Sequence, residues 1–366
     1  MVELGTHLDE KHTVKERAEV EEGFKLLRND DKWMLSTGKI VEDSLYTFGK
    51  LHIADHPSQS LIFDAENAAS YIENNVFTLE EIQEIEAFKP KEFERLPNEI
   101  REYLNKFNCQ STNALRSVLY EKQSWEENYQ RDQHFDLDWI KHSVYTLLRQ
   151  YESGSLKKDH LENWYNVHIW SIIDSAFDDL EELEIISKVR KPMGYRFDFL
   201  IRESNPKSTC SLEYGASEVA KDLELNGNKV LKEGGEKLPK VLKDMLDLLI
   251  ERKQGDCDDL STVGIVHSGL HLRVILADRP KGYVTRVTSY KELRLSTDIT
   301  GFGEQVLPVL VQIYKIKTHV KKVYNLVKEK SKNKANESDW LDNCIKNISG
   351  IITPVTSTST ETPFHK

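Results

Sequence analysis

The fold of this chain is decided by two adjacent segments, Arg190-Lys-Pro-Met-Gly-Tyr-Arg-Phe-Asp-Phe-Leu-Ile-Arg202 and Thr209-Cys-Ser-Leu-Glu-Tyr-Gly-Ala-Ser-Glu-Val-Ala-Lys221. In the first segment, Tyr195, Phe197, Phe199 and Ile201 alternate with a mostly polar set, which is typical of a strand with one apolar face. The run Glu203-Ser-Asn-Pro-Lys-Ser208 has the composition of a turn. We therefore expect a second strand from Cys210 to Tyr214 and a helix that starts at Ala216.

Two acidic residues, Asp198 and Glu213, lie on the two expected strands. Because neighbouring strands lie about 5 Å apart, we expect these carboxylates to meet at one edge of the sheet. Carboxylate oxygens are ligands that suit Mg²⁺. The same two acids could instead be ion-pair partners of nearby arginines, and the sequence leaves both interpretations open.

Composition favours a soluble, intracellular protein. The 366 residues allow one large domain or two ordinary ones, with 39% hydrophobic and 30% charged residues. The longest apolar run, Val306 to Tyr314, is too short to span a bilayer, and the charged N-terminus has no apolar signal core. We expect no membrane association and a cytoplasmic or nuclear location.

Cysteine usage also favours an intracellular protein. The four cysteines lie far apart with no Cys-x-x-Cys pair, which argues against a zinc site or a disulfide framework and for a reducing compartment. They are Cys109, Cys210, Cys257 and Cys344.

Charge is distributed unevenly along the chain. Residues 1–150 carry 29 acidic and 18 basic side chains, so the net charge of −11 belongs to this part, and the rest has 32 of each. Such asymmetry indicates an acidic module, a possible surface for a protein partner, beside a neutral one. The neutral part ends in a basic stripe, for which a solvated helix face is the alternative interpretation. The stripe comprises Lys315, Lys317, Lys321, Lys322, Lys328, Lys330, Lys332 and Lys334.

Three regions are expected along the chain. Residues 1–155 form a mostly helical acidic region, in which a capping box at Thr78-Leu-Glu-Glu81 opens one helix. Residues 156–330 form an α+β core, and the boundary falls within the small polar link Glu152–Lys158. Residues 331–366 are expected to be a disordered tail, rich first in Lys and then in Ser and Thr.

The order of elements in the core is helix, three strands, long helix, further strands and a last helix, which is typical of an α+β fold rather than a regular βαβ series. The expected helices are Leu161 to Leu180, Lys229 to Arg252 and Glu304 to Glu329, and the strands around the hairpin are Leu183 to Val189, Ser261 to His267, Leu270 to Ala277 and Tyr283 to Tyr290.

This order, with an aspartate on the second strand and a glutamate on the third, resembles the core of the PD-(D/E)XK nuclease superfamily. The resemblance implies a restriction-endonuclease-like mixed sheet flanked by helices, with Asp198 and Glu213 as Mg²⁺ (or Mn²⁺) ligands. It also implies an acid from the preceding helix, for which Asp174 is the candidate. The family places a catalytic lysine two residues after the glutamate, where this chain has Gly215. Lys221, with Glu218 one turn before it, is the substitute on the following helix.

The chain also resembles a family of unknown activity that is greatly expanded in early-diverging filamentous fungi. The matching features include Trp164-Tyr-Asn-Val-His-Ile-Trp170, the Gly-x-Arg-x-Asp strand and Glu213-Tyr-Gly-Ala-Ser-Glu218. This resemblance covers roughly Trp125 to Lys322 and implies a fold rather than an activity.

Two functions fit these features. One is a metal-dependent nuclease that hydrolyses DNA or RNA, with Arg196, Arg202 and Lys191 contacting the phosphate backbone. The other is a catalytically inactive module of the same fold that binds nucleic acid or protein.

Overall fold

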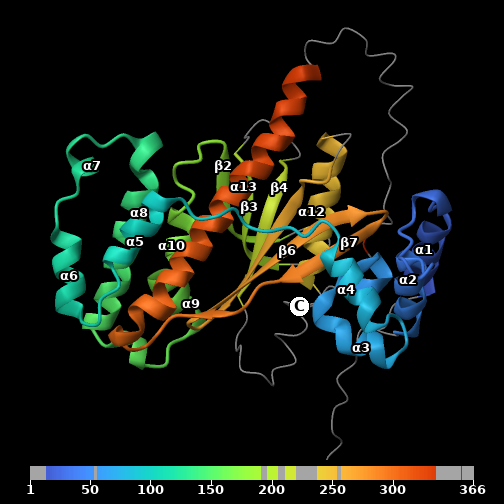
Figure 1. Ribbon diagram of the computed structural model, residues 1–366, viewed down its shortest axis with the longest axis horizontal. Helices are drawn as coiled ribbons and strands as arrows, with labels where there is room; N and C mark the ends of the chain where they lie inside the picture. The colour runs from blue at the N-terminus through green and yellow to red at the C-terminus, as the bar shows by residue number, and fades with distance from the viewer. Residues whose placement is uncertain are drawn as a thin grey trace, which may run out of the picture.

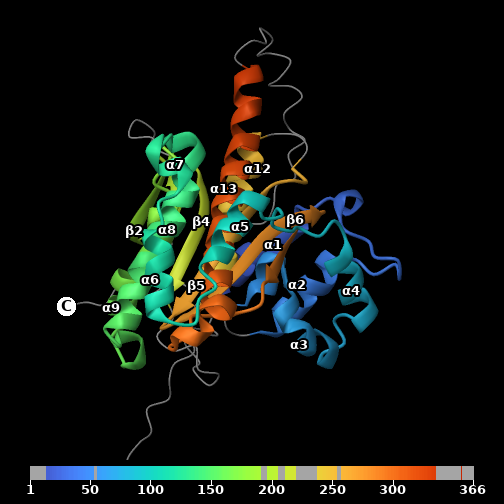
Figure 2. The ribbon, with the colours of Figure 1, turned by 60° about the vertical axis from the view of Figure 1, so that its left-hand side comes forward.

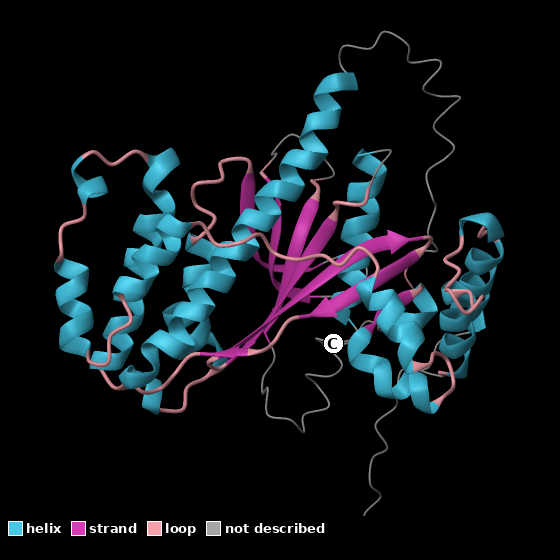
Figure 3. Ribbon diagram, in the orientation of Figure 1, coloured by secondary structure: helices cyan, strands magenta, loops and turns pink. Residues whose placement is uncertain are grey.

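A computed structural model describes residues 14–52, 56–190, 196–204, 211–219, 237–253, 257–334 and 356. Two groups of helices lie at opposite ends of a central sheet, and further helices cover both of its faces (Figures 1 and 3). The fold is therefore α+β with a mixed, open sheet flanked by helices, as the sequence predicts. The expected tail from residue 331 lies mostly outside the described residues, as do Cys210 and Cys344.

The elements follow one another in this order. The N-terminal part contains α1 (Val14–Lys25), α2 (Val41–Leu51), β1 (Ile62–Asp64), α3 (Ala68–Glu73) and α4 (Leu79–Ala87). The helical part contains α5 (Asn98–Lys106), α6 (Thr112–Tyr120), α7 (Ser124–Glu127), α8 (Arg131–Glu152), α9 (Glu162–Tyr165), a π-helix (Asn166–Trp170) and α10 (Ser171–Ser175). The remainder contains β2 (Leu183–Arg190), β3 (Arg196–Glu203), β4 (Glu213–Val219), α12 (Leu238–Lys253), β5 (Ser261–Ser268), β6 (His271–Lys281), β7 (Val284–Ser289), β8 (Leu293–Arg294) and α13 (Leu307–Lys334).

Among the described residues, the sheet has eight strands in the order β1-β7-β6-β5-β4-β3-β2, with β8 paired to β6. Strands β2, β3 and β4 form an antiparallel meander, and β4 then pairs in parallel with β5 across the α12 crossover. The strands expected around the central hairpin are confirmed, with ends that differ by a few residues.

Strand β4 is longer than expected and displaces the start of the expected helix at Ala216. The strand runs from Glu213 to Val219 because its small residues fit between two neighbouring strands. A Cβ atom on Gly215 would lie 2.7 Å from the carbonyl oxygen of Val263 on β5. Pairing with β5 therefore overrides the local preference for a helix in this segment.

The two faces of the sheet carry different apolar cores. On one face, Leu200 and Ala216 pack against α12 through Leu238 and Leu242. On the other face, side chains such as Phe199 join the core made by α8, α10 and α13. Figure 2 shows α13 running along the sheet beside the helical part. Side chains alternate between the faces along each strand, so this division fixes which residues share a face.

The N-terminal part extends the sheet, which the sequence did not predict. β1 pairs in parallel with β7, and Phe63 lies opposite Arg286. The helices around β1 have their own apolar core, which includes Trp33, Phe48 and Tyr71. The N-terminal part is therefore attached through the edge of the sheet as well as through its helices.

Asp64, the last residue of β1, is expected to make stability depend on pH. It is 4% exposed, and burial raises its pKa to about 6. Its unfolded-state pKa is about 3.9, so the folded chain holds the proton more tightly. Above pH 6, the ionised carboxylate of Asp64 lowers the free energy of unfolding by up to about 3 kcal/mol. This destabilisation disappears as pH falls from about 6 to about 4, because the folded chain takes up the proton first.

Asp64→Asn should consequently raise stability at pH 8 by up to about 3 kcal/mol, because the amide buries no charge. Its oxygen can still accept the hydrogen bond from the Glu66 N–H, which is 3.0 Å long in the parent protein. Urea unfolding of both proteins at pH 4.5 and pH 8 measures this, and the gain should shrink at the lower pH. A variant less stable than the parent at pH 8 would contradict the expectation.

Within the described residues, no helix is both long enough and apolar enough to cross a membrane.

Candidate functional site

The register of β3 and β4 separates Asp198 from Glu213. The two strands are antiparallel, and Phe199 lies opposite Ser217. One step further along this ladder places Asp198 opposite Glu218. Glu213 lies opposite Arg202, at the other end of the hairpin and beyond a register shift. Four residues of strand span about 13 Å, so the expected meeting of Asp198 and Glu213 is wrong, and Glu218 takes the neighbouring position.

Asp198 and Glu218 lie on the face that α12 covers. Each is two residues from an apolar residue of that core, Leu200 on β3 and Ala216 on β4. Since residues i and i+2 of a strand share a face, the side chains of Asp198 and Glu218 both project from the same face of the sheet. Both residues are half-buried.

The backbone of β4 fixes the carboxylate of Asp198. The N–H of Val219 donates to Asp198 Oδ2 at 2.8 Å. Directly opposite residues in an antiparallel pair have Cβ atoms about 5 Å apart, which is close enough for two carboxylates to share one ion. Their hard oxygen donors fit Mg²⁺ or Mn²⁺.

The residues that the structure describes add no further cluster of ligands around this pair. Among the described residues, no three His, Cys, Asp or Glu side chains gather into a metal-binding group. A small divalent ion usually keeps several water ligands, so a pair of carboxylates is a sufficient protein contribution.

At the far end of the hairpin, Arg202 forms an ion pair with Glu184, which is neither of the two acids in the ion-pair interpretation. Arg202 donates to Glu184 on β2, with both Nε and a terminal nitrogen 2.9 Å from Glu184 Oε1. Glu203, the next residue, accepts a hydrogen bond of 3.1 Å from the hydroxyl of Tyr214. The expected phosphate-binding residue Arg202 is thus engaged within the sheet, about 13 Å along the strand from Asp198.

Asp174 is not brought to the acid pair. It lies on α10, whose neighbours Ile172 and Ile173 belong to the core on the opposite face of the sheet from α12. Asp174 itself is solvent-exposed, yet the protein around it still desolvates the carboxylate. Burial, and secondly the nearby charge of Asp178, raises the pKa of Asp174 to about 6.

The remaining expected site residues cannot be placed fully. Lys191 and Lys221 lie outside the described residues. Arg196 begins β3 opposite Arg190, and the structure does not describe its side chain. Their proposed roles therefore stay predictions.

The expected basic stripe on α13 is partly used inside the protein. Lys317 is 3% exposed and pairs with Asp136 at 2.5 Å and Asp179 at 2.7 Å. Lys322 pairs with Glu94 at 3.0 Å. Lys317 therefore holds α13 against the helical part, and the pair of Lys322 with Glu94 is exposed on the surface, so the stripe is not one continuous solvated cationic face.

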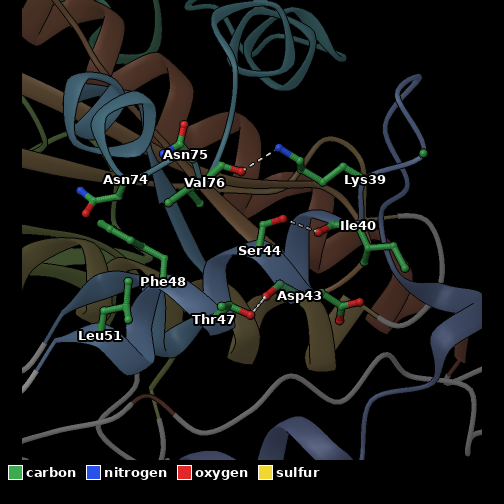
Figure 4. Close-up of a pocket in the computed structure, with 11 residues that line it drawn as sticks. Lys39, Ile40, Asp43, Ser44, Thr47, Phe48, Leu51, Asn74, Asn75 and Val76 are labelled. Atoms are coloured by element: carbon green, nitrogen blue, oxygen red, sulfur yellow. Dashed lines mark hydrogen bonds between the residues drawn. The ribbon is translucent and has the colours of Figure 1, made fainter.

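A surface pocket of about 460 Å³ lies in the N-terminal part, between α2 and the turn that follows α3 (Figure 4). Lys39 Nζ donates to the carbonyl of Val76 at 2.9 Å. The hydroxyls of Ser44 and Thr47 donate to backbone carbonyls four residues earlier in the chain. These bonds hold the wall together, and the pocket belongs to a different part of the chain from Asp198 and Glu218.

Comparisons of this chain with protein-family models, with curated proteins and with solved structures find no match. The function proposed below is therefore derived from the geometry of the sheet.

The sequence contained a signal for Glu218. In an antiparallel hairpin, a residue near the start of one strand lies opposite a residue near the end of the other. Asp198 is the third residue of β3 and Glu218 is the last but one of β4. Treating Ala216–Val219 as strand rather than helix would have paired the two acids.

Proposed function

We propose that this chain is a metal-dependent nuclease of the PD-(D/E)XK type that hydrolyses phosphodiester bonds of DNA or RNA. The observation that supports it most is the pair of carboxylates, Asp198 and Glu218, on neighbouring strands and on one face of the sheet. This revises the expected ligand set, because Glu218 replaces Glu213. The arrangement of three antiparallel strands, a crossover helix and a parallel strand agrees with the proposal.

In this proposal the protein supplies two carboxylate ligands for the metal ion and one lysine side chain. The Val219 N–H restrains the Asp198 carboxylate, so that its second oxygen can face a ligand. Lys221 follows Glu218 by three residues and would stabilise negative charge on the attacked phosphate. A bound Mg²⁺ would act as a Lewis acid and lower the pKa of a coordinated water.

One observation favours the alternative of an inactive module with the same fold. The family's lysine follows the glutamate by two residues, and Ala220 occupies that position after Glu218. If Lys221 cannot replace it, the site would bind nucleic acid without cleaving it.

A cleavage assay separates the two functions. Purified protein is incubated with plasmid, single-stranded DNA and RNA in Mg²⁺, in Mn²⁺ and in EDTA. The nuclease proposal expects metal-dependent products that Asp198→Asn abolishes. Absence of cleavage in both metals, together with salt-sensitive binding, would instead support the inactive module.

A further inference from the structure

The row of residues that contains the acid pair continues across the sheet to an arginine. Glu218 on β4 lies opposite Val266 on β5, and Val266 lies opposite Arg273 on β6. Directly paired residues share a face, so Arg273 is on the same side as Asp198 and Glu218. The flanking Ile275 confirms this, since it belongs to the core under α12. Two strand spacings separate the backbone of Arg273 from that of Glu218, or about 10 Å, and the Val266 side chain between them is buried.

The guanidinium of Arg273 forms ion pairs with two acidic side chains, and a phosphate group could take the place of one of them. One of its terminal nitrogens lies 3.1 and 3.2 Å from the two carboxylate oxygens of Glu66, which follows β1. The other lies 3.7 Å from Glu292, which in turn pairs with His271 at 2.6 Å. A guanidinium binds carboxylate and phosphate oxygens through the same planar set of donors.

These ion pairs are weak enough to exchange. The side chain of Arg273 is 32% exposed and that of Glu66 is 48% exposed. Partly exposed ion pairs of this kind contribute only about 0.2–1 kcal/mol, because water and salt screen them. Exchanging Glu66 for a phosphate, which carries more accessible oxygens, therefore costs little.

We propose that Arg273 binds a backbone phosphate of the nucleic acid, a few nucleotides from the bond held at Asp198 and Glu218, and that Glu66 competes with that phosphate. This inference rests on the proposed function, since it takes the face with the acid pair as the nucleic-acid surface. It gives the N-terminal part a role: Glu66, next to β1, tunes the affinity of the site. The number of nucleotides follows from the separation of about 10 Å and a rise of about 3.4 Å per nucleotide.

Binding without cleavage tests this inference independently of catalysis. Fluorescence anisotropy in EDTA measures the affinity of the full-length protein for labelled 30-nucleotide DNA and RNA between 50 and 200 mM salt. Arg273→Gln should weaken binding roughly tenfold and should reduce the slope of log K against log salt by about 1. Arg116→Gln is the matched control, because Arg116 is 31% exposed and paired with Glu152 on distant helices. It should change neither quantity.

The role of Glu66 needs a double-mutant cycle. Glu66→Gln alone should tighten binding about two- to fourfold, which is the loss of a weak competing ion pair. The same substitution in the Arg273→Gln background should have no effect. An equal gain in both backgrounds would mean that Glu66 acts by general repulsion, and would overturn the competition.

The outcomes distinguish this inference from the proposed function. Cleavage that depends on Asp198, with unchanged binding by Arg273→Gln, overturns the inference and leaves the nuclease standing. A reduced salt slope without any cleavage supports the inference in an inactive module. No measurable binding by the parent protein at 50 mM salt overturns the inference.

Discussion

Glu218→Gln is expected to lower the rate of metal-dependent cleavage about a thousandfold, whereas Glu213→Gln should leave it within about threefold. The two variants should differ because Glu218 and Glu213 lie at different distances from Asp198. Glu218 lies opposite Asp198 on the ladder, and Glu213 lies about 13 Å away beside Arg202. A metal ligand contributes several kcal/mol to the transition state, and each 1.36 kcal/mol is a factor of ten in rate.

Glutamine nearly preserves the shape of glutamate, so the comparison isolates charge and metal affinity. Single-turnover cleavage of a labelled substrate, measured at several Mg²⁺ concentrations, gives the rate and the apparent metal affinity together. Thermal unfolding of both variants checks that the sheet is intact. Loss of activity in Glu213→Gln with full activity in Glu218→Gln would refute the assignment made from the register.

The second large effect is on stability. Arg286→Met is expected to lower the free energy of unfolding by about 4 kcal/mol, because it breaks a buried ion pair. Arg286 is 2% exposed and donates to both carboxylate oxygens of Asp278, at 3.0 and 2.6 Å. It also donates to backbone carbonyls at the end of α4, including those of Ile85 and Phe88.

The loss of stability arises from the buried acceptors that Arg286 would no longer satisfy. Burial raises the pKa of Asp278, and the Arg286 guanidinium opposes that rise. Without Arg286, the Asp278 carboxylate and the carbonyls of α4 would be buried without these donors, which is costly. Because Arg286 joins β7 to α4, the N-terminal part should loosen first.

Urea unfolding measures the loss, and amide hydrogen exchange should show α1 to α4 opening before β5 and β6. Arg116→Met is the control, since Arg116 makes a partly exposed ion pair and should cost no more than about 1 kcal/mol. The pair Arg286→Met with Asp278→Leu should recover part of the stability, because it removes both charges together. No recovery would show that the carbonyls of α4, and not the ion pair, dominate.

The sequence by itself determined the kind of fold. Alternation of apolar residues located β3, because a period of two residues reflects the geometry of the strand backbone alone. It also identified Asp198 as a candidate, since an acid on a strand with an apolar face is visible without a partner. It did not show that Ala216 to Val219 is strand rather than helix, and without that assignment the partner of Asp198 is missed.

Only the tertiary structure decided which residues meet. Ala216 to Val219 reads as a helix start in isolation, and becomes strand because β5 binds its other edge. The addition of β1 to β7, and with it the contact of Glu66 with Arg273, joins residues more than 200 positions apart. Such pairings depend on the summed burial and hydrogen bonding of whole elements, and no local pattern encodes them. Local sequence therefore determined most of the elements, whereas packing between them decided where β4 ends and which residues meet.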